Sequence, residues 1–207
     1  MGGRPSPAIE LVSKGRIIVS IPAFETFERV WFLTWTTYGS WLPGDSRGFV
    51  SPRFEFSPAQ RRNNVVGIPY DVGRSKLIAI AKANMRGDVI LLERAHAAQL
   101  EAQFAETASY RGWTVVVGAV MANHVHLVVG VAGDPEPWVL MRDFKGYASR
   151  ALNRKFGRRP SDTWWTEQGS KRKVKSARHY RAVLNYVLRQ AGALLVFTAN
   201  DPGERGA

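Results

Sequence analysis

The sequence predicts an α+β domain in which an antiparallel sheet is packed against helices. Runs typical of strands and runs typical of amphipathic helices follow one another in the order strand, helix, hairpin, helix, strand, helix. The chain has 207 residues, of which 45% are hydrophobic, and this is enough for one well-filled core. The sequence contains no internal repeat, and we expect a single domain.

The predicted strands are runs of aromatic and β-branched residues with the length of a strand. The first ends at Gly39 and the Pro43-Gly44-Asp45 turn. The middle two are separated only by Ala122 and Asn123, which predicts a tight hairpin. The strands are expected at Val30–Tyr38, Trp113–Met121, His124–Val131 and within Thr163–Val174.

The predicted helices carry apolar residues at three- and four-residue steps and have recognisable ends. Gly112 and Gly157 lie where a helix C-cap belongs, and Ser176 lies where an N-cap belongs. The helices are expected at Glu93–Arg111, Pro135–Phe156 and from Ser176 to about Ala191, with a brief one at Lys76–Met85.

The segments outside these elements have no clear hydrophobic period. Residues 1–29 are expected to form a loose lead-in without fixed structure, and residues 193–207 a short polar tail. Residues 46–92 mix Pro, Gly, Asn and Arg with short apolar patches, and we interpret them as an irregular insertion in the domain formed by residues 30–192.

The formal charge of +12 indicates a polyanionic partner, since basic surfaces bind phosphate chains by releasing condensed counterions. Residues 141–190 contain fourteen Lys or Arg and three acids, a net charge of +11. A solvated face is the simpler interpretation of scattered charges, but this concentration favours binding. Candidate phosphate contacts are Arg142, Lys145, Arg150 and Arg154 on one helix and Lys171, Arg172, Lys173 and Lys175 beyond it.

Cysteine is absent, which excludes disulfides, thiolate zinc sites and cysteine nucleophiles. A metal would therefore be held by His, Asp, Glu or amide oxygens. No run approaches the roughly 18 to 20 apolar residues that span a bilayer, and the first residues do not have the cationic-then-apolar layout expected of a secretory signal. We expect a cytoplasmic protein, associated with the bacterial nucleoid, that has no membrane partner.

His124 and His126 are candidate metal ligands, because residues two apart on a strand project from the same face. Neutral imidazole suits Mn, Fe, Co, Ni or Zn, whereas Mg prefers oxygen, so a two-histidine site needs at least one further oxygen ligand. The alternative is a structural or exposed pair of histidines on a strand.

Tyr186 and Gln190 lie four residues apart on the last predicted helix and therefore share a face. The Gln190 amide can supply a carbonyl oxygen to a metal. A phenol with a pKa near 10 needs a nearby cation or base to attack at neutral pH, and phosphoryl transfer is a fitting reaction. The alternative is that Tyr186 only packs beside the apolar stripe of its helix, and periodicity does not decide between them.

Four segments, taken in order, resemble the single-tyrosine transposases of the HUH superfamily, and most closely the REP-associated tyrosine transposases of the IS200-like family. The resemblance extends from about Val30 to Gly192. One departure is Ala122, where relatives commonly have proline. The segments are Thr34–Asp45 (TWTTYGSWLPGD), Asn123–Leu127 (NHVHL), Phe144–Tyr147 (FKGY) and the Tyr186–Gln190 pair.

The resemblance implies a ferredoxin-like HUH endonuclease fold and assigns roles to individual residues. His124, His126 and Gln190 would hold a divalent metal, Mg or Mn, and Tyr186 would be the nucleophile. Tyr147 is a rival nucleophile on another helix, but it lacks a paired amide ligand.

The implied activity is a metal-dependent single-stranded DNA endonuclease and strand transferase that forms a 5′-phosphotyrosine. The substrate would be single-stranded or hairpin DNA, as found in repeats, and both a homodimer and a monomer remain open. Two alternatives are a domesticated DNA-binding protein that no longer cuts and a relaxase-like nickase.

Overall fold

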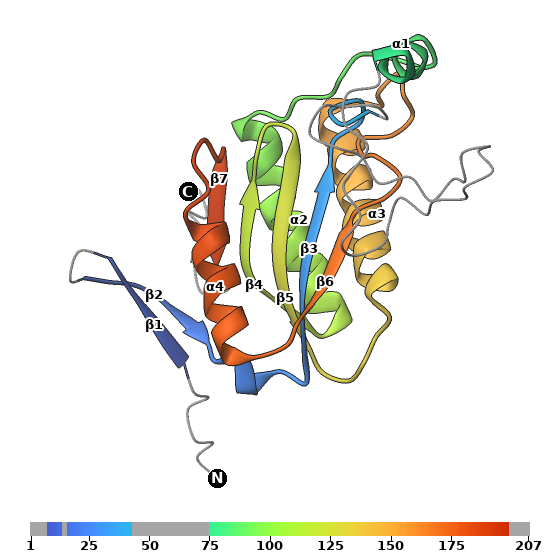
Figure 1. The fold of residues 1–207 in the computed structure, drawn as a ribbon. Helices are drawn as coiled ribbons and strands as arrows, with labels where there is room; N and C mark the ends of the chain where they lie inside the picture. The colour runs from blue at the N-terminus through green and yellow to red at the C-terminus, as the bar shows by residue number, and fades with distance from the viewer. Residues whose placement is uncertain (1–7, 14–15, 43–74, 199–207) are drawn as a thin grey trace, which may run out of the picture.

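The computed structural model describes residues 8–13, 16–42 and 75–198. Its centre is a five-stranded sheet in which every pair of neighbouring strands is antiparallel (Figure 1). The strand order is β6-β3-β5-β4-β7, so that β5 lies in the middle. The strands are β3 (Arg29–Thr36), β4 (Trp113–Val120), β5 (His124–Val131), β6 (Ser170–Val174) and β7 (Leu195–Thr198).

Four of these strands and two helices form a β-α-β-β-α-β unit. Helix α2 (Arg94–Arg111) connects β3 to β4, and helix α3 (Pro137–Phe156) connects β5 to β6. This element order, with an antiparallel sheet whose first and third strands are central, is that of a ferredoxin-like fold. The α+β class predicted from the sequence is confirmed.

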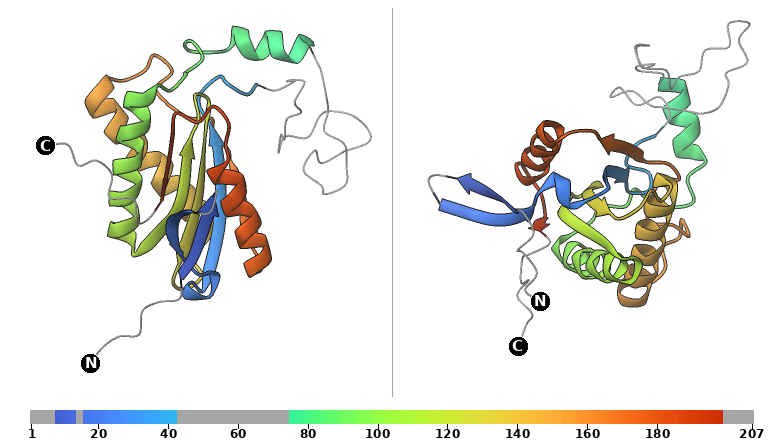
Figure 2. Two further views of the ribbon diagram at one scale, coloured as in Figure 1. Left: turned by 90° about the vertical axis from the view of Figure 1, so that its left-hand side faces the viewer. Right: turned by 90° about the horizontal axis from the view of Figure 1, so that it is seen from below.

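The two faces of the sheet are covered by different helices. Figure 2 shows α2 and α3 on one side and α4 (Ala177–Leu188) on the other. Along β5, Val125 and Leu127 belong to the cluster formed with α2 and α3, whereas Val128 belongs to the cluster formed with α4. His126, two residues before Val128, therefore faces the α4 side.

The helix ends agree with the predicted signals. Gly112 has φ 67°, a left-handed conformation that favours glycine, and its N–H donates to the last carbonyls of α2. The Ser176 side chain accepts from the His179 N–H at the start of α4. Pro137 lies in the first turn of α3, and Gly157 follows its end.

The predicted strand within Thr163–Val174 is shorter than expected. Only Ser170–Val174 is a strand, and Trp165 forms an isolated bridge with Thr37. Trp164 and Trp165 are both buried. The indole N–H of Trp164 donates to Asn153 Oδ1, and that of Trp165 donates to the Lys145 carbonyl. The aromatic run resembled a strand because it is buried, although its backbone is largely irregular. The brief helix expected at Lys76–Met85 is present as α1 (Ser75–Ala83).

Regular structure also occurs in the lead-in and in the tail, where none was expected. The lead-in contains β1 (Ala8–Ser13) paired with β2 (Arg16–Pro22), and a 3₁₀ turn η1 (Phe24–Thr26). The Tyr180 hydroxyl donates to the Pro22 carbonyl at 2.8 Å and joins this segment to α4. In the tail, β7 pairs with β4, so residues 195–198 complete the sheet. Residues 43–74, which include most of the predicted insertion, lie outside the described residues.

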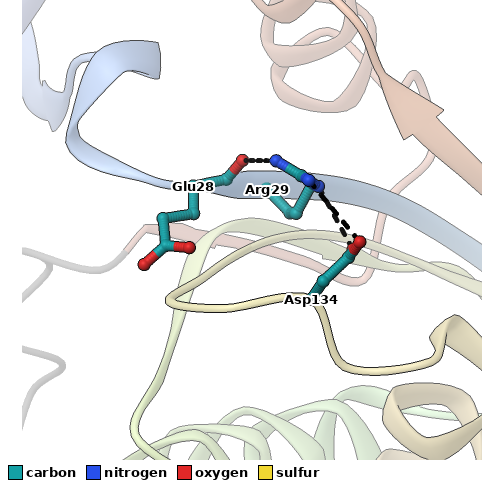
Figure 3. A network of polar contacts seen from close by, with 3 residues as sticks. All are labelled: Glu28, Arg29 and Asp134. Atoms are coloured by element: carbon teal, nitrogen blue, oxygen red, sulfur yellow. Dashed lines mark hydrogen bonds and ion pairs between the residues drawn. The ribbon is translucent and has the colours of Figure 1, made fainter.

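One exposed ion pair joins the start of β3 to the connection between β5 and α3 (Figure 3). Arg29 Nε lies 3.1 Å from Asp134 Oδ1, and its Nη1 donates to the Glu28 carbonyl. Because both side chains are exposed to solvent, the pair contributes at most about 1 kcal/mol. In the part of the chain that the structure describes, no helix is long and apolar enough to cross a membrane.

The β4–β7 edge depends on a glycine. A Cβ at Gly118 would collide with the Phe197 ring, which lies over this position and reaches the core beside Phe104. We expect Gly118→Val to lower the free energy of unfolding by about 1–3 kcal/mol, because the ring must leave its site. Urea titration measures the loss. Gly146, on α3, is the control: a Cβ there has open space, and Gly146→Ala should gain up to about 1 kcal/mol.

Candidate active site

The two predicted histidines converge at the start of β5. Their Nε2 atoms are 3.1 Å apart, and their rings meet edge to face with centroids 4.7 Å apart. His126 is buried and His124 is half-buried. The strand alternation predicted from the sequence therefore places both imidazoles on one face with their Nε2 atoms directed at the same point.

The opposite nitrogen of each ring is held by an oxygen. His126 Nδ1 lies 2.8 Å from Thr34 Oγ1, and His124 Nδ1 lies 2.6 Å from Asn123 Oδ1. When Nδ1 donates to these oxygens, Nε2 keeps its lone pair, which is the tautomer that metal-binding histidines use. Neighbouring strands supply the orientation, since Thr34 is paired with His126 in the β3–β5 register.

Asn123 is itself held in place by residues that directly follow β3. Its main-chain oxygen accepts from the Thr37 N–H at 2.9 Å, from Thr37 Oγ1 at 3.2 Å and from Ser40 Oγ at 3.1 Å. Thr37 is completely buried, so these bonds are protected from water. The Thr-Tyr-Gly-Ser part of the first motif thus anchors the hairpin turn that carries the histidine pair.

Burial, with a smaller contribution from neighbouring His124, lowers the pKa of His126 to about 4. The ring is therefore neutral at neutral pH and retains a lone pair for a ligand. Two facing lone pairs repel each other, so the gap between the Nε2 atoms suits a shared proton or a cation.

The pair fits one half of a metal site. A 3.1 Å separation is what two nitrogen ligands adopt on one ion when each bond is about 2.0–2.1 Å. No group of three or more His, Asp or Glu that could hold a metal occurs in residues 8–13, 16–42 and 75–198. The further ligands would have to be an amide, water or substrate oxygens.

Tyr186 lies beside the histidines on α4. Its ring centroid is 5.4 Å from that of His126 and 6.0 Å from that of Phe32, with edge-to-face geometry in both cases. Phe32 also stacks on His126, with centroids 5.5 Å apart. Tyr186 is nevertheless 52% exposed, so it is not one of the buried residues of its helix. A tyrosine that contacts His126 and remains open to solvent is accessible to a substrate.

Gln190 lies just beyond the end of α4, and its side chain is turned back toward the helix. Its Nε2 donates to the Tyr186 carbonyl at 3.2 Å. This bond leaves the amide oxygen as the atom with which Gln190 could bind a cation. The structure thus brings Tyr186 to the histidines and links Gln190 to Tyr186 through the main chain.

The basic residues of β6 are divided between the two faces of the sheet. Arg172 is paired with Phe32 in the β3–β6 register and therefore projects on the histidine side. Lys171 and Lys173 alternate with it and project on the α3 side, and Lys171 Nζ donates to the Gly169 carbonyl. Lys175 is exposed just before α4. Arg172 is the predicted β6 cation that shares a face with the histidines.

The predicted cations of α3 belong to a helix that covers one face of the sheet, whereas α4 covers the other face, where the histidines lie (Figure 1). Arg142, Arg150 and Arg154 are exposed on α3. Lys145 is half-buried, and its Nζ donates to the carbonyls of residues 166, 167 and 168 at 2.6, 2.9 and 3.3 Å. Burial lowers its pKa to about 8, with Lys171 adding to the effect and Glu167 opposing it. Lys145 fastens a loop, a role that helical spacing alone did not indicate.

Tyr147, the rival nucleophile, also lies on α3 and so is on the opposite side of the sheet from the histidine pair. Its ring contacts Tyr110 and Arg150. Sequence reasoning did not identify Thr34, Asn123 and Phe32 as site residues. The alternation of Thr34 with the buried Leu33 and Trp35 could have placed Thr34 on the histidine face, but its partner strand could not be known.

Removal of the Thr34 hydroxyl tests the orientation of His126. We expect Thr34→Val, which keeps the side-chain shape, to weaken binding of Mn²⁺ about 10- to 100-fold, because the ring loses the partner of its Nδ1. Mn²⁺ titration followed by electron paramagnetic resonance measures the affinity. Thr114→Val is the control. Thr114 lies on β4 and is paired with Gly130, which is four residues after His126 on β5. Equal affinities in both variants would contradict the role of Thr34.

Comparison with known proteins identifies the family. The family model described as "Transposase IS200 like" matches residues 75–190. A comparison with curated proteins gives no match. The solved structures that are similar include a REP-associated tyrosine transposase bound to a REP hairpin, with 12% identity, a TM-score of 0.42 and coverage of 90% of this chain and 70% of that chain. Another is a candidate transposase from Deinococcus radiodurans, with 18% identity, a TM-score of 0.39 and coverage of 88% and 100%.

The family match spans more than half of the chain. It begins at α1 and ends at Gln190, and it therefore includes His124, His126 and Tyr186. Strand β3, whose Thr34 holds His126, lies before the matched range. On the strength of the match, this chain belongs to the IS200-like transposase family.

Proposed function

We propose that this protein is a metal-dependent single-stranded DNA endonuclease and strand transferase in which Tyr186 forms a covalent 5′-phosphotyrosine. The observation that carries the proposal is the contact of an exposed tyrosine with the buried histidine of the pair, 5.4 Å between the Tyr186 and His126 centroids. Family membership supports DNA cleavage and rejoining as the reaction class. The resemblance to the family suggests Tyr186 as the nucleophile and the histidine pair as metal ligands, and the distance between Tyr186 and His126 supports both roles.

The residues that would hold the metal are His124 and His126 through Nε2, with the amide oxygen of Gln190 as a further donor. When bound, Mg²⁺ or Mn²⁺ supplies positive charge that polarises the scissile phosphate and offsets the charge developing on its oxygens. Thr34 and Asn123 keep the imidazoles in the required tautomer and orientation.

Tyr186 performs a transesterification. Its phenolic oxygen forms a bond to phosphorus, and the bond between phosphorus and the 3′ oxygen of the preceding nucleotide breaks. The phenolic proton ends on the leaving 3′ oxygen, so the products are a 5′-phosphotyrosine and a free 3′-hydroxyl. One phosphate ester replaces another, and a 3′-hydroxyl can later reverse the step without ATP.

The position of Tyr186 suits this role. Its exposure gives the phenol access to a DNA strand that approaches along the histidine face, and the Phe32 ring packs against it in edge-to-face geometry. Arg172, on the same face, can bind a neighbouring phosphate as a charge-assisted hydrogen-bond donor. An unpaired strand fits better than a duplex, because in-line attack requires the backbone to reach a side chain that lies against the sheet.

The test uses hairpin DNA with single-stranded flanks, labelled at either end and incubated with the full chain and Mn²⁺ or Mg²⁺. We expect a protein–DNA adduct that survives denaturing electrophoresis, carries the 3′-end label and is absent when a chelator is added. The 5′-end label should be released on a fragment that ends in a 3′-hydroxyl.

Two results would overturn the proposal. Retention of the 5′-end label would mean that the tyrosine is linked to the 3′ phosphate. Binding of the hairpin without any covalent species in either metal would favour a DNA-binding protein that no longer cuts. Measurement of binding by fluorescence anisotropy, in parallel with the adduct, distinguishes the second result from an unfolded preparation.

A further inference from the structure

The side of the molecule away from the histidine pair carries aromatic rings interleaved with arginines. They come from the C-terminal end of α2 and from α3, and we refer to them as the aromatic–arginine patch. The patch consists of Trp138, Arg142, Arg111, Tyr110, Tyr147 and Arg150.

Each ring in the patch is in contact with a guanidinium group. The Arg142 guanidinium carbon lies 5.0 Å from the Trp138 centroid, and that of Arg150 lies 4.3 Å from the Tyr147 centroid. Arg111 lies 5.6 Å from the Tyr110 centroid, and the rings of Tyr110 and Tyr147 are 6.5 Å apart. The contact between Tyr110 and Tyr147 joins α2 to α3 within the patch.

The buried Asp143 forms ion pairs with two of the arginines. Its buried carboxylate pairs with Arg111 Nη2 at 2.6 Å and with Arg142 Nε at 2.8 Å. One carboxylate thus joins the two halves of the patch. The patch thus contains three guanidinium groups and one buried carboxylate, which pairs with two of them, so its net charge is positive.

The rings of the patch are open to solvent at both ends. Tyr110 is 75% exposed and Trp138 is 52% exposed, among the most exposed large aromatic side chains in the described part of the chain. Tyr147 is half-buried, and Arg150 is exposed. Aromatic faces at this exposure are available for stacking, and the neighbouring guanidinium groups remain available for hydrogen bonds.

We infer that the aromatic–arginine patch binds unpaired nucleotides of the DNA strand, with bases stacked on Tyr147, Tyr110 and Trp138 and phosphates paired with the arginines. Stacking platforms interleaved with cations are the arrangement that binds single strands without sequence preference. The net positive charge complements a phosphate chain and disfavours a basic partner such as a second copy of this chain.

The patch would hold a different part of the substrate from the scissile phosphate, because the sheet separates α3 from Tyr186. The inference rests on the proposed DNA substrate, but not on cleavage. A flanking single strand would pass around the edge of the sheet, and its capture would increase the time that the scissile phosphate spends near the histidine pair.

The test measures binding of a fluorescently labelled deoxythymidine oligomer of about 12 nucleotides, within the range of sizes that single-strand binders cover. Tyr147→Leu keeps apolar volume but removes the ring, and Tyr147→Phe keeps the ring. We expect Tyr147→Leu and Tyr110→Ala each to weaken binding about 5- to 100-fold, and Tyr147→Phe to bind like the native protein. Arg150→Ala should lower the slope of log affinity against log salt by about 0.7.

Arg94→Ala is the matched control, since Arg94 is an exposed arginine at the other end of α2. Circular dichroism melting of each variant shows whether the fold is retained, and Tyr110→Ala, at a largely exposed side chain, keeps the test valid if Tyr147→Leu is unstable. Ultraviolet crosslinking of an oligomer with 5-iodouracil should place the crosslinks on patch aromatics.

Equal affinities for the native protein, Tyr147→Leu and Tyr110→Ala would overturn the inference. A loss of dimerisation in sedimentation experiments, with DNA affinity unchanged, would overturn it in favour of contact between two copies. Failure of the proposed function is separate, since it would appear as the absence of an adduct in the native protein while oligomer binding still depended on the patch.

Discussion

Tyr186→Phe is expected to abolish the covalent protein–DNA adduct, a loss of at least about 10³-fold in the rate of its formation. The substitution removes only the oxygen that would bond to phosphorus. Because Tyr186 is about half exposed and its ring contacts with His126 and Phe32 remain, the fold should be unaffected. Denaturing electrophoresis of labelled hairpin DNA measures the rate, and peptide mass spectrometry of the native adduct identifies the modified residue.

Tyr147→Phe is the matched control for this result. Both tyrosines lie on helices and both have aromatic contacts, but Tyr147 is separated from the histidine pair by the sheet. We expect Tyr147→Phe to form the adduct at the native rate. An adduct that persisted in Tyr186→Phe and disappeared in Tyr147→Phe would assign the nucleophile to α3 and refute the proposed mechanism.

His126→Ala is expected to weaken Mn²⁺ binding by more than about 100-fold, because loss of a ligand should exceed the 10- to 100-fold effect of losing its hydrogen-bond partner. Adduct formation at limiting metal should fall in proportion. His126 is buried, so its removal also leaves a cavity beside Thr34 and Phe32, and a thermal melt must accompany the metal titration.

His179→Ala provides the comparison for His126→Ala. His179 is exposed in the first turn of α4, seven residues before Tyr186. The His179→Ala protein should bind Mn²⁺ and form the adduct as the native protein does. Native Mn²⁺ affinity in a folded His126→Ala protein would show that the metal is held elsewhere, and the histidine pair would then be a structural pair of residues.

Much of the fold could be predicted because its signals are local. The caps at Gly112 and Ser176 are contacts within a few residues, and the alternation along β5 follows from strand geometry. The two-residue turn at Ala122 and Asn123 is equally local and sets the hairpin. The strand predicted at Trp164 and Trp165 was wrong, although it also rested on a local signal. These residues have the composition of a strand, but they are buried by side-chain packing, and only Trp165 forms an isolated bridge.

The edges of the sheet could not be predicted in the same way. Strand β7 has only four residues, and its pairing with β4 depends on the Phe197 ring that lies over Gly118. Similarly, the Tyr180 hydroxyl and the Pro22 carbonyl that join α4 to the lead-in are 158 positions apart in the chain. Contacts at such separations are stabilised by burial across elements, for which a local period carries no information.

The sequence by itself determined that His124 and His126 share a face of a strand and that Tyr186 lies on a late helix, because periods of 2 and 3.6 residues fix direction within one element. Only the tertiary structure decided that α4 covers the histidine face, that Thr34 holds His126, and that Arg172 belongs to that face. It also placed the arginines of α3 on the opposite side. The physical reason is that strand register and helix packing are set by side chains distant in sequence, which no single element's pattern contains.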